Sequence, residues 1–400
     1  MSLEFEKLRD SLEHMAQTAA QRQRERRHFV EDLLAVLHEY ANNWTEIERA
    51  LDTAVDQADP KHYRAARPFS DLHPLDVPID PPLPPATATL IATDGSQIMP
   101  DRHAAHLYYL LNIGGIIYHH GQGVPPEPFS EPELHYPQDD AAEADFLYNS
   151  GKVSIERDKK EIGTLADKAW AYRHAAQPLL AILDQRLLYW PIGGSDGQIN
   201  EEVQVWLRGM TKIHDSGALL AGYIDRPMTG YVVTLLLALT GLDDSKFEWK
   251  ELGKRSAGGG LADAVIYGRL LQPFQRSPVF VMIAPPNERF AEHDPANEVC
   301  FFYLHSGRGI ARVDIPRWVA EDEERVTAVH ALLVDQCQIL GDYPYVIARA
   351  DEMAVVGHQD HEELNFMIDL YMQKHGLSRS LTAKQGSKGL ARGGKTRFGV

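Results

Sequence analysis

Acidic residues at the ends of apolar segments are the residues of this chain best suited to catalysis. Asp94 follows the apolar start of TLIATDGSQIMP (residues 89–100), and Gly95 and Ser96 come directly after it. A carboxylate at the end of a buried strand, with a glycine that lets the backbone turn, commonly holds a divalent cation beside a phosphate. Asp-Gly-Ser is also an ordinary turn sequence, so the tripeptide alone leaves both interpretations open.

Further carboxylates lie in comparable positions in other segments. They are Glu161 in SIERDKKEIGTLADKAW, Asp196 in RLLYWPIGGSDG, Asp225 at the end of ALLAGYID, and Asp351 in ARADEMAVV. Cleavage of a phosphodiester by two metal ions needs carboxylates from several elements to converge on a site about 4 Å across. Taken singly, Glu161 can be an exposed partner of Arg157 one helical turn earlier, and Asp225 can cap the helix that follows it.

The charge distribution bears on the partners of the chain. A net charge of −17 over 400 residues argues against nucleic acid, because phosphate binding draws on clustered Lys and Arg. Residues 375–400, however, contain six basic residues and no acidic one: Arg379, Lys384, Lys388, Arg392, Lys395 and Arg397. This composition predicts a flexible basic tail that contacts a phosphate backbone or an acidic partner, or a disordered solubilising end.

The sequence predicts a cytoplasmic protein that makes no membrane contact. Its longest apolar run, residues 231–242, is much shorter than the roughly 20 residues that cross a bilayer. The first residues include Glu4, Glu6 and Lys7, whereas an export signal has an apolar core. Two cysteines, Cys300 and Cys337, give no disulfide framework or metal-binding motif.

Hydrophobic spacing predicts the order of the elements. Residues 1–60 are expected to be an N-terminal helical segment, residues 61–88 a stiff proline-rich linker, residues 89–372 the core domain, and residues 373–400 the flexible basic tail. Within the core we expect a hairpin around Gly114 and Gly115, a proline-rich loop at 124–137, a mostly helical segment at 141–185, strands at 186–192 and 218–225, a helix at 229–242, and a strand passing into a helix at 345–356. This order predicts a mixed sheet flanked by helices.

Taken in order, four segments resemble the NurA family, the 5′-to-3′ DNA nucleases that work with the HerA-type hexameric ATPase. The segments are ATDGSQIMPDRH, SIERDKKEIGTLADKA, LLAGYIDRPMTGYVVTLLL and DYPYVIARADEMAVV, and the resemblance covers residues 60–372. It implies an α/β fold with an RNase H-like core, whose first three strands are antiparallel neighbours. That expectation agrees with the strand order predicted from the residues.

The resemblance also implies roles for individual residues. Asp94 matches the metal ligand of the first strand, and Glu161 matches the glutamate of the helix. The third carboxylate of the family lies in an Asp-Gly turn, where this chain reads IGGSDG, so the ligand is displaced to Asp196 or absent. Tyr343 matches the family tyrosine, and Asp351 replaces the metal-binding histidine eight residues further on. Oxygen ligands suit hard cations, so this replacement is compatible with Mg²⁺ or Mn²⁺.

By this resemblance the catalytic residues are Asp94, Glu161, Asp196, Tyr343 and Asp351, and the metal ligands are the four carboxylates among them. Asp225 is a weaker candidate ligand, and His358 or His361 could replace Asp351. The residues expected to contact DNA are Arg102, Lys384, Lys388 and Arg392. Arg102 would also stabilise the charge that develops on the phosphate.

These residues predict a Mn²⁺- or Mg²⁺-dependent DNA exonuclease or endonuclease that acts in DNA end processing and repair. The resemblance implies a homodimer docked on a HerA-type hexameric ATPase. One alternative is a catalytically inactive DNA-binding or regulatory subunit of the same motor complex, favoured if Asp196 points away from Asp94. Another is a metal-dependent phosphatase or nucleotidyl enzyme for small substrates, which would have a closed pocket in place of a groove.

Overall fold

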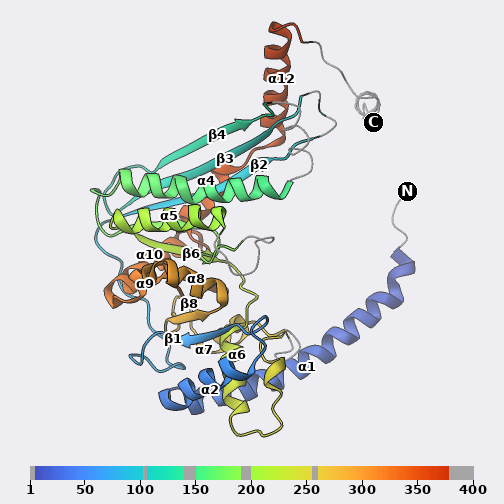
Figure 1. Cartoon of the computed structure of the whole chain (residues 1–400), viewed down its shortest axis with the longest axis vertical. Coiled ribbons are helices and arrows are strands. Elements are labelled where there is room, and N and C mark those ends of the chain that lie inside the picture. The colour runs from blue at the N-terminus through green and yellow to red at the C-terminus, as the bar shows by residue number, and fades with distance from the viewer. Residues whose placement is uncertain are drawn as a thin grey trace. The chain divides into compact units, whose positions relative to one another are not determined.

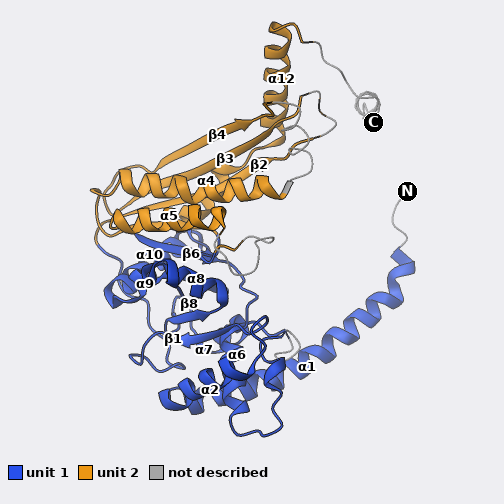
Figure 2. Cartoon of the chain, in the orientation of Figure 1, with its two compact units in different colours: residues 1–85, 185–188, 219–344 blue, residues 86–184, 189–218, 345–400 orange. Residues whose placement is uncertain are grey.

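The computed structural model describes residues 5–101, 104, 106–138, 150–190, 200–254 and 260–377, and its elements fall into two compact units (Figure 2). Unit 1 comprises Met1–Pro85, Gln185–Leu188 and Leu219–Pro344, and unit 2 comprises Ala86–Asp184, Tyr189–Ala218 and Tyr345–Val400. Five of the predicted site residues lie outside the described residues: Arg102, Asp196, Lys384, Lys388 and Arg392.

The strands of unit 1 form an antiparallel arrangement. They are, in order across the sheet, β1 (Ala65–Pro68), β7 (Phe280–Ile283), β8 (Val299–His305), β9 (Ile310–Pro316) and β6 (Leu219–Ile224). Each strand is antiparallel to its neighbour in this series. Strand β1 lies within the range that we expected to be a linker, and it pairs with β7 through Ala65 opposite Ile283. Part of that range therefore belongs to the packed sheet.

Seven helices among the described residues accompany these strands in unit 1, and α1 projects away from them (Figure 1). They are α1 (Arg9–Tyr40), α2 (Trp44–Gln57), α6 (Tyr231–Gly241), α7 (Asp263–Leu270), α8 (Pro285–His293), α9 (Arg317–Ala320) and α10 (Glu323–Leu340), with short 3₁₀ turns at Phe5–Leu8, Trp249–Glu251 and Pro295–Asn297. Helix α6 is almost entirely buried, which explains its continuous apolar sequence. Helix α1 buries only its C-terminal part, at Val30, Leu33 and Leu37.

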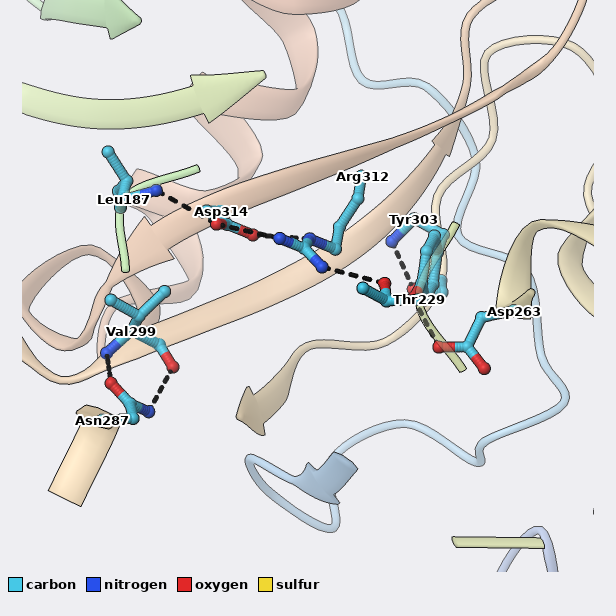
Figure 3. A network of polar contacts seen from close by, with 9 residues as sticks. Leu187, Thr229, Asp263, Asn287, Val299, Tyr303, Arg312 and Asp314 are labelled. Atoms are coloured by element: carbon cyan, nitrogen blue, oxygen red, sulfur yellow. Dashed lines mark hydrogen bonds and ion pairs between the residues drawn. The ribbon is translucent and has the colours of Figure 1, made fainter. Parts of the chain in front are cut away.

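A buried polar network holds unit 1 together (Figure 3). The fully buried carboxylate of Asp314 pairs with Arg312 at 2.8 Å and accepts the Leu187 backbone N–H at 3.1 Å. The carboxylate of Asp263, also fully buried, accepts the N–H groups of Val232 and Val233 at 3.1 and 2.8 Å. Asp263 therefore caps the first turn of α6, and the expectation that Asp225 caps this helix is wrong.

Unit 2 contains the predicted RNase H-like strand order. Its strands are β5 (Leu179–Leu183), β2 (Ala88–Ile98), β3 (Tyr109–His120) and β4 (Glu127–His135), in this order across the sheet. The three consecutive strands β2, β3 and β4 are antiparallel neighbours, and β5 is parallel to β2. The mixed sheet predicted from the sequence is therefore confirmed.

Four helices of unit 2 accompany these strands: α4 (Ser150–Ala171), α5 (Glu201–Asp215), α11 (Tyr345–Ala354) and α12 (His358–Lys374). Helices α4 and α11 both pack on β2 and β3. Helix α11 is helical from its first residue, so the expected strand at this place is wrong. The following helix, α12, has no buried residue.

Three further expectations for unit 2 are wrong in detail. Strand β3 runs straight through Gly114 and Gly115, which we expected to form a hairpin turn. The expected proline-rich loop at 124–137 contains strand β4, whose prolines, Pro128 and Pro132, lie on the outermost strand of the unit. The strand expected at 186–192 instead ends earlier, as β5 at Leu183.

None of the helices in the described ranges is both long and apolar enough to cross a membrane.

Candidate functional site

The site begins where strand β2 loses one of its two partners. The parallel pairing of β2 with β5 ends at Thr93 opposite Leu183, whereas the pairing with β3 continues to Ile98. Asp94 is the first residue beyond the last β5 pair. Its backbone continues as a strand through Gly95, so the Asp-Gly-Ser sequence forms no turn. The side chain of Asp94 is half-buried at this open edge.

Gly114 allows helix α11 to approach Asp94 closely. It lies directly opposite Asp94 on β3, and a Cβ atom at this position would come within 2.0 Å of the backbone nitrogen of Ala354. Asn112 donates from Nδ2 to the carbonyl oxygen of Ala354 at 2.9 Å, and the Ser96 hydroxyl donates to the same oxygen. The sheet therefore binds the C-terminal end of α11 by close packing and by hydrogen bonds.

This arrangement brings Asp351, one helical turn before the end of α11, to Asp94. The carboxyl group of Asp351 lies close enough to that of Asp94 to raise the pKa of Asp94. Burial raises the pKa of Asp94, the N–H of Gly95 at 2.8 Å lowers it, and the contact with Asp351 raises it again. Two carboxylates in contact repel each other when both are ionised, and a proton or a cation relieves this repulsion.

Glu161 and Arg157 lie beside Gly95 on the other face of β2. Because side chains alternate along a strand, Asp94 and Ser96 face α11, whereas Gly95 faces α4. A Cβ atom at Gly95 would lie 2.8 Å from Cγ of Arg157 and 3.2 Å from Oε2 of Glu161. Glu161 is 3% exposed, so it is not the solvated surface partner that helical spacing alone would favour.

The donor chemistry of this cluster fits a hard divalent cation. Asp94, Glu161 and Asp351 are carboxylates, whose oxygens such a cation prefers, and the nearby carboxyl group of Asp351 raises the pKa of Asp94. Across the described part of the chain, however, no three His, Cys, Asp or Glu side chains form a group that could hold a metal ion. Asp196, the fourth expected ligand, lies outside that part.

Two predicted residues belong to unit 1. Tyr343 packs edge-on against Tyr223, with ring centroids 5.5 Å apart and planes at 89°. Asp225 directly follows β6, is about half exposed, and lies 3.6 Å from Nε of Arg226. Unit 2 places Asp351 beside Asp94, and Glu161 lies beside Gly95 on the other face of β2. Glu161 as a ligand of the same cation stays a prediction, as do the roles of Tyr343 and Asp225 in unit 1.

The two histidines considered as substitute ligands lie on α12. His358 is 75% exposed and pairs with Glu362 at 3.6 Å. His361 lines a pocket of about 360 Å³ with His106, Tyr108 and Asp369.

Sequence reasoning missed the residues that position the carboxylates. Gly95, Gly114 and Asn112 set the approach of α4 and α11, and Arg157 supplies positive charge beside Asp94. One signal was available: a glycine inside a strand often marks a place where another backbone or side chain comes close. The pair Gly114 and Gly115 interrupts an apolar strand pattern in that way.

A sequence profile described as the NurA domain matches residues 88–356. Among solved structures, the NurA nuclease from Sulfolobus solfataricus matches with 14% identity and a TM-score of 0.45, over 86% of this chain and 97% of that chain. LC9-RNase H1, a type 1 RNase H with the type 2 active-site motif, matches with 13% identity and a TM-score of 0.21, over 45% of this chain and 86% of that chain. A comparison with curated proteins gives no match.

Unit 2 is an α/β unit with a mixed sheet, and Asp94 lies directly beyond the last β2–β5 pair. The matched profile covers more than half of the chain, so this chain belongs to the NurA family, a family of nucleases.

Proposed function

We propose that this chain is a DNA nuclease that requires Mn²⁺ or Mg²⁺ and cleaves as a 5′-to-3′ exonuclease, an endonuclease, or both. The observation that carries the proposal is the contact between Asp94 and Asp351 beyond the last β2–β5 pair. This edge of the sheet is open to solvent at Asp351, which is exposed. An open edge suits a polymeric substrate better than the closed pocket that a small-substrate phosphatase would need.

In this proposal Asp94 and Asp351 hold the cation, and Glu161 and Asp196 complete its ligands. A bound divalent cation would activate water and offset the negative charge that develops on the phosphate. Asp94, whose pKa is raised, must be ionised when the cation binds, because carboxylates bind metals in their ionised form. The N–H of Gly95 fixes one oxygen of Asp94, Oδ1, and so orients the other.

The remaining expected contacts are part of the same proposal. Tyr343 would position the phosphate or the attacking water, Asp225 is a weaker candidate ligand, and Arg102 would offset charge on the phosphate. Lys384, Lys388 and Arg392 in the basic tail would contact DNA by charge alone, independent of base sequence.

A second candidate function is a catalytically inactive DNA-binding or regulatory subunit. One observation favours it: the described residues contain no group of three or more side chains that could hold a metal ion. The two candidates differ in whether the purified chain cleaves DNA.

We also propose a homodimer that docks on a HerA-type hexameric ATPase, which would deliver DNA ends in the cytoplasm. Support comes from α1 and the turn before it, where Phe5, Leu8, Leu12 and Met15 are exposed at alternating spacings of three and four residues. This spacing is typical of a helix that packs against another helix. The variant Leu12→Glu with Met15→Glu should lower the particle mass, measured by light scattering. An unchanged particle mass would show that this face of α1 does not contribute to the assembly.

Cleavage of an end-labelled linear duplex with Mn²⁺ or Mg²⁺ tests the nuclease proposal. We expect the native chain to degrade the duplex and Asp94→Ala and Asp351→Ala to lose at least about 10²-fold in rate, a typical effect of removing a metal ligand or its support. Glu352→Ala is the matched control, since Glu352 is the next residue on α11 and pairs with Arg349. Cleavage by neither the native chain nor the control would favour the inactive subunit, and equal cleavage by all four would contradict the assigned site.

A further inference from the structure

Arg157 places a cation beside the carboxylates of the candidate site. It lies on α4 one helical turn before Glu161, and its side chain crosses over Gly95, where a Cβ atom would lie 2.8 Å from Cγ and 3.0 Å from Cδ of Arg157. Asp94 directly precedes Gly95. The positive charge of Arg157 lowers the pKa of Asp94, against the larger effect of burial. Arg157 therefore lies beside the residue that follows Asp94 and interacts with Asp94 through charge.

Two side chains hold the guanidinium of Arg157 in a fixed plane. Nε and Nη2 donate to Oδ1 of Asp158 at 3.2 and 2.7 Å, and Nη1 donates to Oε1 of Gln97 at 3.1 Å. A guanidinium carries five N–H donors. Within the described ranges, two of these donors therefore have no acceptor, and the side chain of Arg157 is 30% exposed. The group is oriented in advance and still reachable from solvent.

The charge of Arg157 is maintained by its surroundings. Burial would lower its pKa, but the carboxylates of Asp158, Glu161 and Asp94 raise it above its ordinary value. Its described hydrogen bonds go to the carboxylate of Asp158 and to Gln97, whereas Glu161 and Asp94 interact with Arg157 through charge.

We propose that Arg157 binds a phosphate of the DNA substrate through its remaining N–H donors and is a catalytic residue of this nuclease. The inference rests on the proposed nuclease function. A planar guanidinium pairs with phosphate oxygens by two parallel hydrogen bonds, which fix the orientation of the phosphate as well as offset its charge. Arg157 would hold the phosphate at the open edge, next to Asp94 and Asp351.

The test compares Arg157→Ala, Arg157→Lys and the matched control Lys160→Ala on the labelled duplex. Lys160 lies on the same helix and carries the same charge, but it pairs with Glu133 at 2.8 Å. We expect Arg157→Ala to lower kcat/KM by about 10²- to 10³-fold, as when one preorganised donor to a transition state is removed. Arg157→Lys should recover only part of this loss, because lysine keeps the charge without the planar fork. Lys160→Ala should stay within about 2-fold of the native value, since exposed ion pairs contribute little.

A second measurement separates phosphate binding from a structural role. Binding of a fluorescein-labelled 30-base-pair duplex is measured without divalent metal at several salt concentrations, which gives the slope of log Kd against log salt. This slope should be smaller in Arg157→Ala than in the native chain by about 0.9, the value for one lost phosphate contact. A residue that only supports Glu161 would leave this slope unchanged.

The outcomes distinguish this inference from the proposed function. If the native chain cleaves DNA and the kcat/KM of Arg157→Ala is within about 3-fold of the native value, the proposed role of Arg157 is overturned. The proposed nuclease function is unaffected by that result. An unchanged salt slope in Arg157→Ala and in Arg157→Lys would also overturn it, whether or not the chain cleaves. Failure of the native chain to cleave, with Asp94→Ala indistinguishable from it, would overturn the nuclease and with it the catalytic role of Arg157.

Discussion

Replacement of Gly114 by alanine should disrupt the site without removing any of its functional groups. A Cβ atom at this position would lie 2.0 Å from the nitrogen of Ala354 and 2.2 Å from the carbonyl carbon of Met353, about 1.4 Å short of an ordinary contact. Both obstacles are backbone atoms of α11, so no side chain can rotate to make room. The helix as a whole must move away from β3.

The cost of this movement can be worked out from the contacts that it breaks. Overpacking in a well-packed region costs about 1–3 kcal/mol. Displacement of α11 also stretches the hydrogen bonds from Asn112 and Ser96 to the carbonyl of Ala354, each of which contributes about 1 kcal/mol. We therefore expect Gly114→Ala to lower the free energy of unfolding by about 3–5 kcal/mol and to separate Asp351 from Asp94. DNA cleavage should fall with that separation.

Gly163→Ala supplies a control of opposite sign. Gly163 lies inside α4 with nothing within 4 Å of an added Cβ atom, so alanine should stabilise the helix by about 0.5–1 kcal/mol and leave cleavage unchanged. Urea unfolding followed by circular dichroism gives both free energies, and the labelled duplex gives the rates. A Gly114→Ala variant as stable and as active as the native chain would refute the reasoning, because α11 would then not depend on this glycine.

Three further predictions concern metal and protons. Removal of divalent metal with EDTA should abolish cleavage, and added Mn²⁺ or Mg²⁺ should restore it; cleavage in excess EDTA would contradict a metal requirement. Because the pKa of Asp94 is raised, its protonation should compete with Mn²⁺ at low pH, so affinity measured by calorimetry should increase as pH rises. An affinity independent of pH between 4 and 8 would contradict binding of the cation by Asp94. Burial raises the pKa of Asp263 to about 6, above its unfolded value, so its contribution to stability is greatest below pH 4 and falls by about 3 kcal/mol as pH rises through 6. In urea unfolding, Asp263→Asn should be less stable than the native chain at pH 4 but should not lose stability as pH rises through 6. If the variant and the native chain show the same dependence of stability on pH, Asp263 is not the source of the loss.

The strand order of unit 2 could be predicted because it depends on local patterns and on short connections. The apolar run before Asp94 predicted β2, and the alternation of apolar segments predicted a mixed sheet. Local patterns did not predict that Gly114 and Gly115 lie within a strand. Glycine pairs are common in turns, but here both lie within a strand, because α11 and the ring of Phe129 occupy the space where their side chains would be.

The carboxylates of the site could be selected from the sequence, but their environment could not. Helical spacing suggested an exposed ion pair between Glu161 and Arg157, whereas packing of α4 on β2 buries Glu161 and directs the guanidinium of Arg157 to Asp158 and Gln97. Gln97 is distant from α4 in sequence. Contacts between residues so far apart depend on the tertiary fold, which periodicity within one segment does not describe.

The most direct test of the account is the affinity for Mn²⁺, measured by calorimetry on the full chain at pH 7.5 for the native protein, Asp94→Asn, Asp351→Asn and the double variant. If the two carboxylates hold one cation together, each single substitution should weaken binding by at least about 10-fold, and the loss in the double variant should differ from the sum of the single losses by more than about 0.5 kcal/mol, as expected for groups in contact. Native affinity in both single variants would contradict a shared cation site at Asp94 and Asp351.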